Sequence, residues 1–130
     1  MTLRTYQAFV DDFRTQAFGL PVAHENDDFT PTPGTAWVRL RFFENEVTPV
    51  GHTSIDDETG LFQFTLHYPL DEGAIPARTM ADTILSAYPP RRLFSYSGQQ
   101  VEVTGALIFD ASPVDGWYQI VGRVNYRAFV

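Results

Sequence analysis

The stretch Ala36–Glu44, with the sequence AWVRLRFFE, has the pattern of a β-strand, because apolar residues alternate along it with arginines and aromatic residues. Side chains of a β-strand point to opposite faces with a period of two. Val38, Leu40 and Phe42 therefore fall on one face, and the stretch predicts a strand that packs this face on the core. The other face carries a set of aromatic and cationic residues: Trp37, Arg39, Arg41 and Phe43.

A second alternating stretch, Leu61–Tyr68 with the sequence LFQFTLHY, predicts another strand. Between the two strands, Pro49-Val50-Gly51 is typical of a turn, and we expect a short strand around residues 51–55. The acidic run Asp56–Gly60 follows, and its composition predicts the solvated tip of a β-hairpin. The run lacks the ligand spacing of a calcium-binding loop.

Two helices are predicted from apolar residues at helical spacing. Residues 3–18 form the first and are followed by Gly19, which favours a helix end. Residues 74–88 form the second, with Pro76 in the first turn, where its missing N–H costs little.

Two more strands are expected at residues 101–109 and from about 117 to 129. Consecutive strands with short connections pair antiparallel, and two helices suffice to cover one face of the resulting sheet. The sequence therefore predicts an α+β fold with a mixed, mainly antiparallel sheet, two α-helices on one face and a protruding β-hairpin. At 130 residues the chain is expected to be a single domain, 1–130.

The composition excludes several classes of protein. With 44% hydrophobic residues the chain is too apolar to be disordered, and the absence of Cys removes disulfides and thiolate chemistry. The net charge is −7, which disfavours tight binding to the phosphates of nucleic acids. All nine basic residues are arginines, which either interface ion pairs or genome composition would explain. No stretch is typical of a targeting or membrane-spanning segment.

No catalytic arrangement is found in the sequence. His24, His52 and His67 lie far apart, lack metal-binding spacing and are expected at the surface. Adjacent acidic residues in a strand point to opposite faces and make no acid–base pair. Nucleophile-elbow, dinucleotide and phosphate-loop motifs are all missing. We therefore expect no catalytic residue, no cofactor and no metal.

The arginine and aromatic strand face is instead typical of a protein–protein interface, in which both residue types are enriched. Packing beneath a loop would explain the same residues, and stacking on nucleic-acid bases is a weaker alternative on an acidic chain. The candidate interface residues are Trp37, Arg39, Arg41, Phe43, Asp56, Asp57, Glu58, Arg91 and Arg92.

One long stretch resembles a known family. Residues 25–39, ENDDFTPTPGTAWVR, are similar to the EN-x-x-F-x-P-x-x-G-T-x-(aromatic)-(V/L)-R stretch of the tail terminator proteins of long-tailed bacteriophages. In that family a G-x-F-Q strand follows, as at residues 60–66, and then a helix opens after a glycine, as at Gly73, with Ala-Asp in its middle, as at residues 81–82. The final strand is similar at Tyr126-Arg127-Ala128.

This resemblance implies a structural virion protein of the tail or neck, assembled in the host cytoplasm. It implies a homo-oligomeric, hexameric ring that caps the head-proximal end of the tail tube and joins it to the head. The implied partners are further copies of the chain, the tail tube protein and a head-completion or connector protein. DNA enters only as passing cargo, and no membrane is involved. A head-closure, connector or other neck protein remains an alternative, with a small-molecule enzyme less favoured.

Overall fold

The structure, a computed structural model, describes residues 3–49 and 56–129, which form two helices and one six-stranded sheet. In chain order the elements are α1 (Leu3–Gln16), β1 (Val22–Ala23), β2 (Trp37–Pro49), β3 (Asp56–Pro69), α2 (Ile75–Ala87), β4 (Leu93–Tyr96), β5 (Gln99–Val114) and β6 (Trp117–Phe129). The strand order is β1-β2-β3-β6-β5-β4, and only the β1–β2 pair is parallel. The predicted α+β fold is confirmed.

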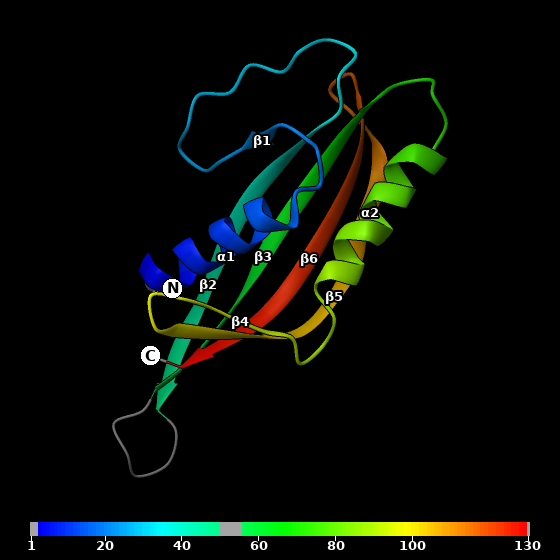
Figure 1. Cartoon of the computed structure of the whole chain (residues 1–130). Helices are drawn as coiled ribbons and strands as arrows, with labels where there is room; N and C mark the ends of the chain where they lie inside the picture. Colours follow the sequence, from blue (N-terminus) through cyan, green and yellow to red (C-terminus); the bar gives the residue numbers. More distant parts are fainter. Residues whose placement is uncertain (1–2, 50–55, 130) are drawn as a thin grey trace.

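Both helices lie on one face of the sheet (Figure 1). α1 crosses in front of β2 and β3 and contacts β4 and β5, whereas α2 lies along β6 and β5. Among the described residues, no helix or strand covers the opposite face. The molecule is therefore a two-layer α/β sandwich with one open sheet face.

Each helix buries one stripe against the sheet, as its apolar spacing predicts. α1 buries Phe9 and Phe13, and α2 buries Ala77, Ala81 and Ile84. α1 ends at Gln16, two residues earlier than expected. At the next position the chain turns to a positive φ of 53°, a left-handed conformation that cannot continue a helix.

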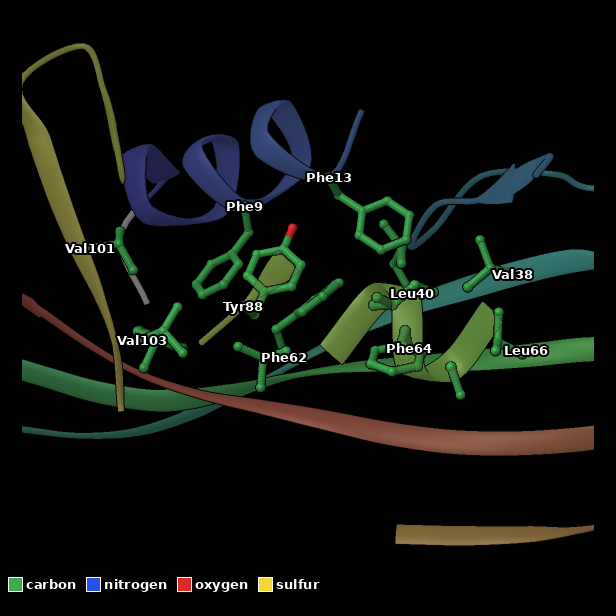
Figure 2. Packing of buried hydrophobic residues seen from close by; sticks show 14 of the residues in the cluster. Phe9, Phe13, Val38, Leu40, Phe62, Phe64, Leu66, Tyr88, Val101 and Val103 are labelled. Carbon is green, nitrogen blue, oxygen red and sulfur yellow. The ribbon is translucent and has the colours of Figure 1, made fainter. Parts of the chain in front are cut away.

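The core is centred on aromatic rings between α1 and the sheet (Figure 2). Phe9 is fully buried, and its ring stacks on Phe62 with 5.3 Å between the ring centroids. The rings of Phe94 and Tyr126 meet Phe9 edge-on, each at 5.0 Å. Burying one such side chain stabilises the fold by roughly 2–3 kcal/mol. The single aromatic ring of Phe9 thus joins α1 to three strands of the sheet.

The predicted hairpin tip at Asp56–Gly60 is wrong. These residues belong to β3, and most of them pair on both sides, so that Gly60 lies opposite Glu44 of β2 and Tyr126 of β6. Glu58 is fully buried and accepts a 3.2 Å hydrogen bond from the hydroxyl of Tyr126. Two flanking strands supply backbone partners for the run, and this pairing outweighs its turn-like composition. The strand expected at residues 51–55 lies outside the described residues.

The last predicted strand, from about 117 to 129, is confirmed as β6, whereas the bounds of β5 differ from the expected ones. β5 runs from Gln99 to Val114, longer than the predicted 101–109, and it contains two bulges, at Val103/Gly105 and Ile108/Asp110. Bulges shift the alternation of side chains by one position and so hide a strand from a period-two search. The short strands β1 and β4 carry too few residues to show a pattern.

Candidate functional site

The open face of the sheet carries a row of side chains that crosses four strands and includes two arginines. Backbone register places Arg41 of β2 opposite Gln63 of β3, Gln63 opposite Arg123 of β6, and Arg123 opposite Leu107 of β5. Arg39 lies on the same face, two residues before Arg41 in β2. The face thus gathers arginines in an otherwise acidic molecule.

Arg39 and Arg41 lie over aromatic rings of the same face. The guanidinium carbon of Arg39 lies 5.2 Å from the ring centroid of Trp37, and that of Arg41 lies 4.7 Å from Phe43. Both arginines are exposed, and neither forms an ion pair with any described carboxylate. Stacking limits the rotamers of a cation without neutralising its charge. The face therefore presents pre-organised positive charge to a partner.

Exposed apolar side chains lie beside this charge on β5. Leu107 is 47% exposed and Phe109 is 57% exposed, and the guanidinium of Arg123 lies 3.8 Å from the ring centroid of Phe109. Phe109 is at the second bulge, where the strand turns an extra side chain outward. Arginine next to exposed aromatic and aliphatic surface is typical of protein interfaces.

A second aromatic cluster closes one end of this face. Trp37 and His67 are stacked nearly parallel with 3.7 Å between ring centroids, and both are 5% exposed. Trp117 meets Trp37 edge-on at 6.0 Å, and Phe29 covers Trp37 from the loop before β2 at 5.0 Å. Burial lowers the pKa of His67 to about 4, so the ring is neutral at pH 7. His67 lies on the outer strand face as expected, but the expectation that it is exposed is wrong.

The predicted interface residues divide into separate groups. Trp37, Arg39, Arg41 and Phe43 share the open face, as their alternation predicts. Glu58 points into the core, where a partner has no access to it. The backbone of Asp56 and Asp57 lies in β3, and Arg91 is exposed in the loop before β4.

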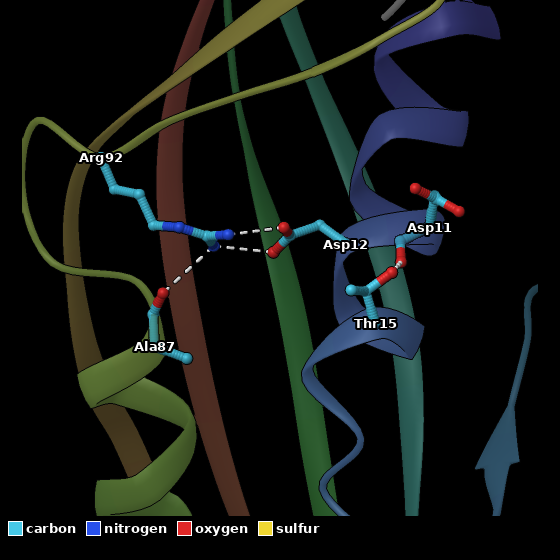
Figure 3. Close-up of polar contacts among 5 residues, drawn as sticks. All are labelled: Asp11, Asp12, Thr15, Ala87 and Arg92. Carbon is cyan, nitrogen blue, oxygen red and sulfur yellow. Dashed lines mark hydrogen bonds and ion pairs between the residues drawn. The ribbon is translucent and has the colours of Figure 1, made fainter.

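Arg92 is committed to a contact within the chain (Figure 3). Its guanidinium donates two hydrogen bonds to Asp12 of α1, of 2.7 and 2.6 Å, and one of 3.1 Å to the carbonyl of Ala87 at the end of α2. It also packs over the rings of Tyr88 and Phe94. The hydrogen bonds to Asp12 raise the pKa of Arg92 and fix its charge. Arg92 therefore joins both helices to β4, a structural role.

Sequence reasoning missed Arg123, Leu107 and Phe109. The Leu107–Phe109 stretch has the composition of a buried strand. Only the register between β5 and β6, together with the bulge, shows that two of its side chains face outward beside Arg123.

The largest hollow among the described residues lies beside the open face of the sheet. This hollow of about 540 Å³, beside the edge of β2, is lined by Glu25, Asn26, Arg39, Leu40 and Arg41. Glu25 there accepts a 3.2 Å hydrogen bond from the backbone N–H of Phe42 and so covers part of the strand edge. Within residues 3–49 and 56–129, no three acidic or histidine side chains gather as metal ligands, and no helix is long and apolar enough to cross a membrane.

The chain is similar in fold to a solved structure and in sequence to a known family. One solved structure is 19% identical in sequence and superposes with a TM-score of 0.77, covering 95% of this chain and 92% of that chain, so the two share a fold. No curated protein sequence matches the chain. The family described as phage tail terminator protein matches residues 4–126, almost the whole length. The chain therefore belongs to the phage tail terminator family.

Proposed function

We propose that the protein forms a closed ring on the head-proximal end of a phage tail tube, where it ends tube polymerisation and offers a surface to a head-completion protein. The family match over residues 4–126 carries this proposal, because the family is one of structural proteins of the phage tail. The chain is accordingly a tail component of the virion, and the ring and its partners are the proposed refinement.

The open sheet face supports an assembly role. In a ring, each copy contacts one neighbour through one surface and the other neighbour through a different surface. The face offers unpaired arginines and exposed apolar groups, whereas the helix layer presents a different surface.

Deletion of the gene from its phage tests the proposal. We expect overlong tails in electron micrographs and tails of normal length again when the wild-type gene is supplied in trans. Finished tails of normal length that fail to join heads would instead assign a head-closure or connector role.

The purified protein gives a second test. Native mass spectrometry is expected to show closed rings, with or without isolated tail tubes. A strict monomer in the presence of tubes would overturn the ring.

A further inference from the structure

We propose that neighbouring copies in the ring meet through the open sheet face of one copy and the loop before α2 of the next. This inference rests on the proposed ring and names its contact. The basic face is defined as Arg39, Arg41, Leu107, Phe109 and Arg123. The acidic loop is defined as Leu70, Asp71 and Glu72, together with Ile75, the first residue of α2.

The acidic loop has the opposite charge and the same exposed apolar character. Ile75 is 80% exposed and Leu70 is 42% exposed, and Asp71 and Glu72 between them are also exposed. Neither carboxylate forms an ion pair with any described side chain. The loop turns through positive φ angles at Asp71 and Gly73, and Figure 1 shows it at the end of the sheet, ahead of α2. It is thus a projecting feature with two apolar residues and two unpaired acids.

Electrostatics favours a second copy as the occupant of the basic face. Each copy carries a net charge of −7, so most orientations of two copies are repulsive. The basic face is where arginines without carboxylate partners gather, and pairing it with Asp71 and Glu72 turns repulsion into attraction. Leu107 and Phe109 would then cover Leu70 and Ile75, which removes apolar surface of both copies from water.

The two patches also suit a ring geometrically. They belong to different surfaces of one chain, one on the open sheet face and the other on the loop beyond the end of β3. Contact between unlike patches is heterologous, which is the type of contact that neighbouring copies make in a closed ring. If the basic face instead contacted the basic face of a neighbouring copy, arginines would lie against arginines.

Charge reversal at one residue of each patch tests the contact. Arg41→Glu places a carboxylate opposite Glu72, and Glu72→Arg places a cation opposite Arg41. Each variant alone is expected to raise the subunit dissociation constant at least about tenfold, as a like-charge pair at an interface does. The double variant is expected to form rings again, because every contact regains opposite charges.

Mixing the two single variants gives the sharpest result. Copies with Glu at position 41 and copies with Arg at position 72 satisfy each other in both directions, so an equimolar mixture is expected to assemble rings in which the two variants alternate. Native mass spectrometry identifies such rings by equal numbers of the two masses. Matched controls are Arg78→Glu on α2 and Asp28→Arg in the loop before β2, both exposed, which should leave the rings unchanged. Circular dichroism verifies that every variant is folded.

The outcomes separate this inference from the proposed function. Wild-type rings with unaffected single variants would overturn the contact and leave the ring standing. Loss of binding to tail tubes or to duplex DNA by Arg41→Glu, with rings intact, would assign the basic face to that partner and also overturn the contact. A wild-type protein that stays monomeric with tail tubes would overturn the proposed function and the inference together.

Discussion

Gly122 lies in β6 directly beneath the ring of Phe64, and the two are register partners in β3 and β6. A Cβ at this glycine would lie 2.1 Å from the ring's Cζ atom, so the ring or the backbone would have to move. Gly60 makes the same kind of room for Tyr126, whose hydroxyl would lie 2.6 Å from an added Cβ. At these two positions the strands carry glycine, and aromatic rings of the core fill the space that a side chain would occupy.

Gly122→Ala is therefore expected to destabilise the fold by about 2–3 kcal/mol, because overpacking forces a well-packed ring off its rotamer. Denaturant unfolding followed by fluorescence measures this free energy. Gly105→Ala is the matched control, since a Cβ at Gly105 in β5 meets no atom within 4 Å. Equal effects of the two substitutions would contradict the packing argument, and Phe64→Leu combined with Gly122→Ala should recover part of the loss.

His67 makes stability depend on pH. Burial lowers its pKa to about 4 in the folded chain, against an ordinary value of 6.5 in the unfolded chain. Between these values the unfolded state binds more protons, so the free energy of unfolding rises with pH from about 4 to about 6.5. We expect a gain of about 3 kcal/mol across this window, measured by urea unfolding at a series of pH values.

The variant His67→Phe isolates this contribution. It keeps a flat ring against Trp37 and removes the titrating group, so most of the rise between pH 4 and 6.5 should disappear. A folded variant with the same pH profile as the wild type would assign the dependence to other groups.

Among the elements, β4 and the ends of both helices depend on one ion pair. The side chains of Arg92 and Asp12 are 24% and 11% exposed, so this pair is far better shielded from water than the Arg14–Asp11 pair, at 79% and 40%. Arg92→Ala is expected to cost about 2 kcal/mol, because it leaves Asp12 and the carbonyl of Ala87 without their partner.

The exposed pair supplies the control. Arg14→Ala should cost at most about 0.5 kcal/mol, since exposed ion pairs contribute little. A double-mutant cycle of Arg92 and Asp12, measured by thermal unfolding, gives the coupling between the two side chains directly. A coupling near zero would contradict the role of this pair in joining α1 to β4.

The strands show which parts of the fold and of the candidate surface could be predicted from the sequence. The alternation of side chains predicted both faces of β2, because the strand has no bulge at Val38, Leu40 and Phe42. It failed at Asp56–Gly60, where pairing with β2 and β6 overrides a turn-like composition. It also missed Phe109, because a bulge and a register set by tertiary pairing decide its direction. Local pattern thus predicted half of the candidate surface, and the other half required knowledge of which strands are neighbours.

For the whole molecule, the distribution of charge matters more than its total. The open face gathers Arg39, Arg41 and Arg123, although the chain as a whole carries −7. A protein partner can pair with this small group of arginines alone. A long polyanion such as DNA would also lie near the acidic rest of the surface, which repels it.

We therefore expect no retention of duplex DNA at physiological salt, with a dissociation constant weaker than the roughly 10⁻⁴ M at the weak end of non-specific DNA binding. Fluorescence anisotropy of a labelled duplex, titrated with the assembled protein at two salt concentrations, measures this. Arg39→Glu combined with Arg41→Glu should leave the anisotropy unchanged while it weakens self-assembly. Salt-sensitive binding at micromolar protein, abolished by that double substitution, would identify the open face as a phosphate-binding surface. DNA would then be a held ligand rather than passing cargo.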